Sequence, residues 1–152
     1  MLKNSVWIAV ISLLGLVPLD PVVAGETYVA ELQPVEVTGA GAGGVATLIL
    51  DDFESEIAFT IEYEGLSGPE IASHVHRADG TIVFDLPPGS RKVGVWQNPG
   101  FVNVFLLRSE QLFILVHTEA HPGGEIRGDI RARTVALKGD SWGAVKALYE
   151  GD

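Results

Sequence analysis

Cysteine is absent from the 152 residues of this chain. Disulfide bonds, thiolate metal sites and cysteine nucleophiles are therefore excluded, as is attachment to a membrane through a lipidated cysteine. The fold must be stabilised by an apolar core or by a metal that other side chains bind.

Basic residues are scarce, with 10 Lys and Arg against 20 Asp and Glu and a net charge of -10. The acidic residues are spread along the chain rather than grouped in one run. A surface of this kind repels the phosphates of nucleic acids and anionic lipids. We therefore expect no nucleic acid among the partners, and interpret the partner as an extracellular protein or surface ligand that the sequence does not identify.

Motifs of the common catalytic sites are also missing. There is no Gly-x-Ser-x-Gly elbow, and Ser73 points away from His74 if both lie on one strand. The glycine-rich stretch 39–44 lacks the lysine and the following helix of a phosphate-binding loop. The sequence therefore supplies no catalytic residue, and we favour a protein without enzymatic activity.

Long apolar segments are limited to Trp7–Val17, which follows Lys3 and is shorter than the roughly 20 residues of a membrane-spanning helix. Small residues precede Gly25, ending at Ala24. This pattern predicts a signal peptide over residues 1–24 and a secreted or periplasmic protein with no membrane span after cleavage. A retained membrane anchor is the alternative.

The rest of the chain has the pattern of an all-β protein. In Glu56–Glu64 apolar and polar residues alternate, as in a strand with one buried face. Short β-prone segments recur every eight to twelve residues, which predicts an antiparallel β-sandwich or barrel over residues 25–135. Residues 91–111 are ambiguous, because Phe101–Leu107 fits either a strand or a short buried helix.

The tail, residues 136–152, has a different periodicity. Its apolar side chains fall at helical spacing behind a possible cap at Asp140 or Ser141; they are Trp142, Val145, Leu148 and Tyr149. We predict a short C-terminal amphipathic helix that packs on its own sandwich, with docking to a partner as the alternative.

All four histidines fall in two clusters, His74 with His76 and His117 with His121. Residues i and i+2 of a strand share a face, so His74 and His76 project together. Two such imidazoles and a third from a neighbouring strand would suit copper or zinc, with His121 as a possible fourth ligand. Such pairs also occur by chance, and then form hydrogen bonds to carboxylates or backbone carbonyls.

The turn after His121 carries several residues with a structural interpretation. Gly123, Gly124 and Gly128 predict a positive-φ turn and a close backbone approach. Glu125 and Arg127 are two residues apart, so we expect them to form an ion pair on one strand face. Alternatively, they orient a histidine as residues that support metal ligands do.

Several of these segments together resemble the chordin-like (CHRD) domain, over about Tyr28–Ala132. They are Gly44-Val45-Ala46-Thr47-Leu48, Gly65-Leu66, Ser73-His74-Val75-His76-Arg77, and His117-Thr118 followed by Pro122-Gly123-Gly124-Glu125-Ile126-Arg127-Gly128. The resemblance implies an extracellular β-sandwich of the kind found in chordin and in microbial exported proteins. The bone morphogenetic protein partner of animal chordin is not carried over to this chain.

A second resemblance is to copper/zinc superoxide dismutase. A Gly-Leu turn precedes the His-x-His strand, and His74, His76 and His117 match three copper ligands of that family. The loop with the zinc ligands and the disulfide has no counterpart between Arg77 and Phe84. The resemblances imply a Greek-key sandwich or barrel, superoxide dismutase-like or immunoglobulin-like.

Two hypotheses follow from the sequence. In the first, the protein is a non-enzymatic extracellular binding or structural module, and the histidines form a hydrogen-bonded polar cluster with Glu125 and Arg127. In the second, it binds copper or zinc through three histidines and has a redox or metal-handling role. They differ in whether the ring nitrogens converge on one point.

Overall fold

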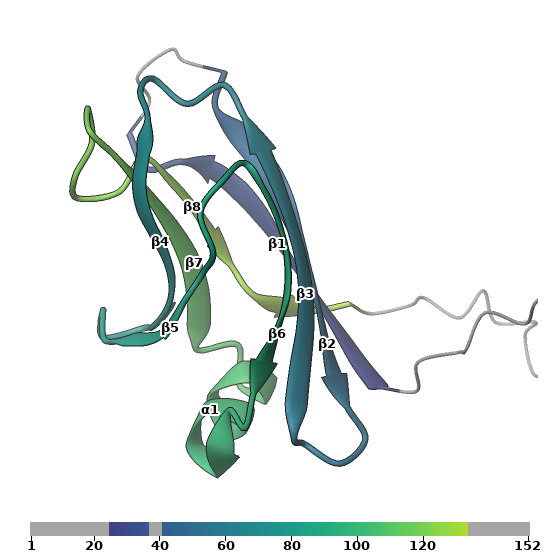
Figure 1. Cartoon of the computed structure of the whole chain (residues 1–152). Helices are drawn as coiled ribbons and strands as arrows, with labels where there is room; N and C mark the ends of the chain where they lie inside the picture. The colour runs from purple at the N-terminus through teal and green to yellow at the C-terminus, as the bar shows by residue number, and fades with distance from the viewer. Residues whose placement is uncertain (1–24, 37–40, 134–152) are drawn as a thin grey trace, which may run out of the picture.

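The computed structural model describes residues 25–36 and 41–133. In this part of the chain, short strands and one helix form a nearly closed antiparallel barrel with two layers (Figure 1). The strands are β1 (Gly25–Pro34), β2 (Gly43–Asp51), β3 (Glu56–Glu64), β4 (Glu70–Arg77), β5 (Ile82–Asp85), β6 (Arg91–Gln97), β7 (Leu112–Thr118), β8 (Ile126–Asp129) and β9 (Arg131–Ala132). The helix is α1 (Gly100–Arg108). The predicted antiparallel β fold is confirmed.

The strand order contains a Greek-key connection. Hydrogen-bonded neighbours follow the order β5-β4-β7-β8-β1-β2-β3-β6, and β9 pairs with β1. After β3 the chain crosses to the other layer to form β4 and β5, and β6 then returns beside β3. β1 joins the layers, because most of it pairs with β2 while Gln33 and Pro34 pair with β8.

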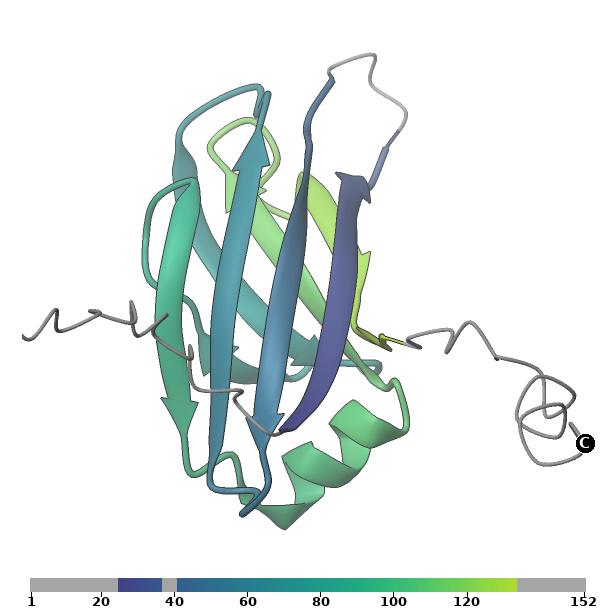
Figure 2. The same cartoon turned by 90° about the vertical axis from the view of Figure 1, so that its right-hand side faces the viewer.

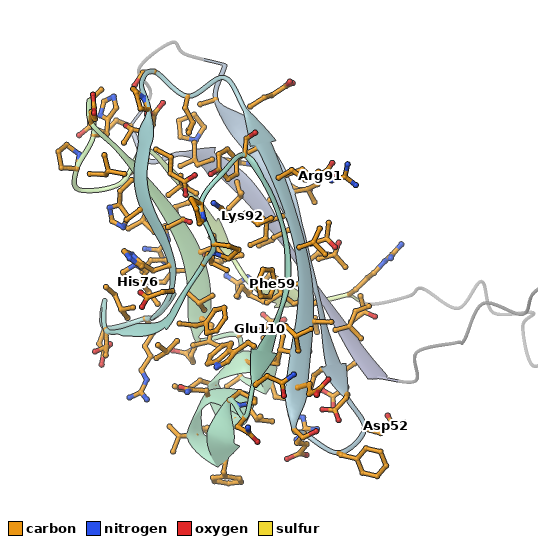
Figure 3. The ribbon with its side chains drawn as sticks, viewed as in Figure 1. Asp52, Phe59, His76, Arg91, Lys92 and Glu110 are labelled. Carbon is orange, nitrogen blue, oxygen red and sulfur yellow. The ribbon has the colours of Figure 1, made fainter. Side chains whose placement is uncertain are left out.

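The core lies between the two layers and follows the alternation of the sequence. On β3, Ile57, Phe59, Ile61 and Tyr63 are buried, and the residues between them are exposed or half-buried. Because successive side chains of a strand point to opposite faces, this pattern places one face of β3 in the core. Figure 3 shows Phe59 between the layers.

Side chains fill the gap in the barrel between β5 and β6. Phe84 of β5 stacks on Trp96 of β6 with the ring centroids 5.0 Å apart, and it meets the Phe59 ring edge-on. These aromatic contacts replace the backbone hydrogen bonds that would otherwise close the barrel.

A buried ion pair also joins the layers near this gap. The Lys92 side chain is 0 % exposed, and its Nζ lies 2.7 Å from a carboxylate oxygen of Glu70. Glu70 also accepts hydrogen bonds from the Tyr63 hydroxyl and from the backbone N–H of Gly89. Burial opposes ionisation of Glu70, but its contacts with Lys92 and Tyr63 outweigh that effect and lower its pKa.

The ambiguous segment 91–111 contains both kinds of structure. β6 ends at Gln97, and α1 begins at Gly100, whose positive φ of 77° places it where glycine is favoured. Val104 and Leu107 are the buried residues of α1 and pack into the core, so the helix covers one end of the barrel (Figure 2). The helix of the described structure therefore precedes β7.

Three sequence predictions fall outside the described residues. They are the signal peptide over residues 1–24, the C-terminal helix in residues 140–149 and the end of the domain at residue 135. Among the residues that the structure describes, no helix has the length and apolar character needed to cross a membrane.

Candidate metal centre

Three histidines meet on the outer face of the layer that contains β4 and β7. Ser73 and Val75 of β4 are buried in the core, so His74 and His76 project from the opposite face. His117 of β7 pairs with Ala72, which places it diagonally opposite His74. Figure 3 shows His76 on the side of β4 that faces away from the other layer.

One residue of β4 departs from the alternation of the strand. Strict alternation would place Ile71 on the inward face with Ser73 and Val75, but its side chain is exposed. The pairing of β4 with β7 shifts register between Glu70 and Ala72, and this irregularity turns Ile71 outward. A second shift, in the pairing of β4 with β5, lies between Val75 and His76, but the His74 and His76 rings still meet on one face, with their centroids 5.5 Å apart.

The three imidazoles are close enough to share one ion. One nitrogen from each of His74, His76 and His117 lies within 4.8 Å of the other two. An ion at the centre of such a triangle is at most about 2.8 Å from each nitrogen, and zinc or copper needs about 2.0 Å. Side-chain rotations that move each ring nitrogen by less than about 1 Å would therefore bring all three to the coordination distance.

Backbone carbonyls determine which nitrogen of two rings is free. Nδ1 of His76 lies 2.9 Å from the carbonyl oxygen of Gly80, and Nδ1 of His117 lies 2.9 Å from that of Pro122. A carbonyl oxygen only accepts hydrogen bonds, so each Nδ1 must carry the proton and donate. In the neutral rings, Nε2 of both histidines then has a free lone pair, as metal ligands require.

His74 has the opposite arrangement. Its Nε2 lies 3.6 Å from a carboxylate oxygen of Asp85 on β5, which favours the proton on that nitrogen and leaves Nδ1 free. Burial, followed by the neighbouring His117 and His76, lowers the pKa of His74, and Asp85 opposes this shift. These effects keep the ring neutral at neutral pH.

The free nitrogens are also the ones that lack a partner. Nδ1 of His74, Nε2 of His76 and Nε2 of His117 are buried and have no hydrogen-bond partner among the described residues. Leaving a buried polar atom unpaired costs about 1–3 kcal/mol. A bound cation would satisfy all three at once.

An aromatic stack fixes the ring of His76. The Phe113 ring of β7 lies parallel to it, with an interplanar angle of 7° and centroids 5.1 Å apart. The Arg127 guanidinium of β8 lies 3.6 Å from the Phe113 centroid. The order of the strands, with β7 between β4 and β8, places Phe113 between the imidazole and the guanidinium.

The fourth histidine is not part of this group. His121 lies in the turn after β7, where its backbone N–H bonds to the Thr118 side chain. The same Thr118 hydroxyl donates a hydrogen bond to the Glu125 carboxylate. The structure therefore brings together His74, His76 and His117 of the four predicted ligands.

The predicted ion pair between Glu125 and Arg127 is wrong. Glu125 is buried and accepts hydrogen bonds from Thr118 and from the backbone and hydroxyl of Ser67. Arg127 is bound to Asp129 instead. β8 begins only at Ile126, so Glu125 still belongs to the turn and does not share the face of Arg127.

The glycines of the turn differ in their requirements. Gly124 has a positive φ of 117°, and a Cβ there would lie 2.5 Å from the Leu115 side chain. A Cβ at Gly128 would lie 2.8 Å from the Glu31 carbonyl oxygen, which fits a close backbone approach. Gly123 has neither property, so the structure gives no steric reason for a glycine there.

Sequence reasoning missed the residues that support the histidines. The Gly80 carbonyl, in the turn between β4 and β5, has no sequence signature that marks it as the hydrogen-bond acceptor of His76. The role of Asp85 depends on its pairing opposite His74 in the hairpin of β4 and β5. An alternating pattern in a segment as short as β5 does not specify that register.

The fold and the cluster together define a class: an antiparallel Greek-key barrel with three converging histidines on one outer face. The family model of the CHRD domain matches residues 23–130. The chain belongs to the CHRD domain family, as its sequence motifs predicted. No solved structure matches the chain.

Proposed function

We propose that this protein is an extracellular binding module whose ligand is one copper ion, held by His74, His76 and His117. Two observations carry the proposal: one nitrogen of each ring lies within 4.8 Å of the other two, and each ring has a buried nitrogen with no hydrogen-bond partner among the described residues. In two of the rings the second nitrogen is bonded to a backbone carbonyl, which fixes both the tautomer and the orientation.

Copper is favoured over zinc by the donor set. The three candidate donors are imidazole nitrogens, and the chain contains no cysteine that could supply a thiolate. For a given set of nitrogen donors, divalent copper binds more tightly than zinc. Zinc also accepts three imidazoles, so it is the second candidate for the same site.

A polar cluster without metal is less well supported. In that interpretation the histidines would be stabilised by hydrogen bonds to one another, to carboxylates or to carbonyls. Three of their nitrogens have no such bond, and Glu125 and Arg127, which were expected to complete the cluster, bind other residues. A single cation would pair all three of these nitrogens.

The position of the site suits metal handling. His74 and His117 are only partly buried, so an ion there would remain open to exchange with ligands in solution. No catalytic group is needed for this role. With the predicted signal peptide, the protein would bind copper outside the cytoplasm.

The test is metal retention by the purified protein. The protein is loaded with copper, dialysed, and analysed for bound metal by mass spectrometry. We expect one copper for each chain, and loss of that copper in His76→Ala and in His117→Ala. His121→Ala is the matched control, because it removes a histidine outside the cluster, and it should retain the metal.

Two further results complete this test. Bound copper should raise the free energy of unfolding, by about 4 kcal/mol when free copper is a thousandfold above its dissociation constant. Zinc should compete only at a higher concentration than copper. Failure of the unmodified protein to retain either metal, or equal loss in His121→Ala, would refute the proposal.

A further inference from the structure

The outer face of α1 is an apolar surface that the described residues leave uncovered. It consists of Phe101, Val102 and Phe105, which lie on one side of the helix because they are separated by one, three and four positions. Their exposed fractions are 80 %, 54 % and 58 %. The opposite side of α1 packs into the core through Val104 and Leu107.

These three exposed apolar side chains lie next to one another on a protein that is otherwise rich in acidic residues. Large apolar side chains that are exposed together mark surfaces that another segment or molecule covers. The acidic character of the chain disfavours an anionic membrane as that covering element. An apolar segment of a polypeptide is the better fit.

The described chain ends beside this surface. The backbone N–H of Arg133 bonds to the carbonyl oxygen of Thr27, and the Arg108 side chain at the end of α1 binds the adjacent Glu26. Glu110, two residues after α1, binds Arg131 and the backbone of Ala132. Residues 134–152 therefore continue from a point next to the C-terminal end of α1.

The tail has both the length and the side chains to cover the helix. Trp142 follows Arg133 by nine positions, which an extended chain can span over up to about 30 Å. α1 itself, with nine residues, is about 14 Å long. The apolar residues of the tail recur at helical spacing, and they are Trp142, Val145, Leu148 and Tyr149.

We infer that the segment 140–149 docks on the outer face of α1 in the same molecule, through this apolar stripe. The contact buries Phe101, Val102 and Phe105 against the tail. The tail thereby covers the end of the barrel that α1 closes. This inference does not depend on the metal site, which lies on β4 and β7.

A pair of introduced cysteines tests this contact directly, because the chain has no thiol of its own. The variant Val102→Cys with Val145→Cys places one thiol on α1 and one on the stripe. Val93→Cys with Val145→Cys is the control. Val93 is similarly exposed, at 67 %, but lies on β6.

At low protein concentration, docking predicts an intramolecular disulfide that forms at least ten times faster in the Val102 pair than in the Val93 pair, since docking raises the effective concentration of the thiols. Equal rates in the two pairs would overturn the inference. A disulfide between two chains in place of the intramolecular one would also overturn it, in favour of a second copy as the occupant.

The fluorescence of Trp142 provides an independent measurement. Its emission spectrum is obtained by subtracting the spectrum of the Trp142→Phe variant from that of the unmodified protein. Docking buries the indole and therefore predicts a blue-shifted emission. The double variant Phe101→Ser with Phe105→Ser changes only exposed side chains and should shift this emission to the red. Emission that is already red in the unmodified protein, or unchanged in the double variant, would contradict docking.

Discussion

At the scale of single residues, the site depends on which nitrogen of each imidazole is held by a neighbouring acceptor and which is left free to bind a metal. His76 and His117 each use Nδ1 to hold a carbonyl and leave Nε2 for the cluster, while His74 leaves Nδ1. The difference follows from the neighbouring acceptors, because the Gly80 and Pro122 carbonyls bind Nδ1 of His76 and His117 while Asp85 lies near Nε2 of His74. The sequence identified the three residues but not these roles.

The buried ion pair of Lys92 and Glu70 leads to a specific prediction about stability. Replacing Glu70 by Ala would leave the buried Lys92 ammonium without a carboxylate, with the Pro87 carbonyl and the face of the Tyr63 ring as its contacts among the described residues. Loss of one member of a buried ion pair costs about 3–5 kcal/mol. We expect a loss of that size in the free energy of unfolding measured by urea denaturation.

The matched control is the exposed pair of Arg91 and Glu62, which lies on neighbouring strands of the same layer. Because water screens this pair, Glu62→Ala should cost less than about 1 kcal/mol. Similar losses for the two variants would show that Glu70 does not stabilise a buried charge.

Glu125 shows why one residue-level prediction failed. Spacing of two residues implies a shared face only if both residues lie in the same strand. Glu125 lies in the turn before β8, and its carboxylate binds Ser67, which is distant in sequence. No local pattern marks that contact, since it depends on how the chain between β3 and β4 packs against the end of β7.

At the scale of elements, the turn between β4 and β5 positions one ligand. Gly80 has a φ of 89°, and its carbonyl oxygen accepts the hydrogen bond from His76. A β-branched residue is strained at such a φ, so Gly80→Val should move the carbonyl. Loss of such a supporting hydrogen bond typically weakens metal binding about 10- to 100-fold.

Copper titration of Gly80→Val would measure this effect. Gly100→Val is the control, because Gly100 also has a positive φ with open space around it and lies at the start of α1, away from the histidines. The control should lose stability without losing copper affinity. Equal affinities for the two variants would mean that the Gly80 carbonyl does not orient His76.

Elements with a clear periodicity could be predicted from the sequence, and α1 could not. The alternation of Glu56–Glu64 matches β3 to the residue. In Phe101–Leu107, six of the seven residues are apolar, on the buried and exposed sides alike, so neither a helical nor a strand period is visible. The helix forms because its place in the fold lets Val104 and Leu107 fill the end of the barrel, which is tertiary information.

At the scale of the whole molecule, two carboxylates connect distant parts of the barrel. Glu70 joins the start of β4 to β6, and Glu125 joins the turn before β8 to Ser67. Burial alone would raise the pKa of each, but their hydrogen bonds outweigh it, and the pKa of each is lowered from 4.5. Their contribution to stability is therefore complete above about pH 4.5 and is lost as the pH falls through the lower folded values.

We accordingly expect the free energy of unfolding to decrease when the pH is lowered from 5 to 3. Urea denaturation over this range would measure it. In Glu125→Gln, which has no carboxylate to protonate at that position, the decrease should be smaller. A free energy of unfolding that is constant or rises towards pH 3 would contradict this account of the two carboxylates.

The Greek-key order could be predicted as a class from the strand spacing and the family motifs, but the closure of the barrel could not. It depends on Phe84 and Trp96, which are twelve residues apart in sequence and meet only because β5 and β6 lie in different layers. The same strand order brings β4 beside β7, which is what assembles the histidine cluster.

The most direct measurement is a crystal structure of the copper-loaded protein, with the ion located by its anomalous scattering. Our account predicts one copper about 2.0 Å from Nδ1 of His74, Nε2 of His76 and Nε2 of His117. It also predicts that the hydrogen bonds to Gly80 and Pro122 are kept. Copper bound elsewhere, or the three nitrogens in place without an ion, would contradict it.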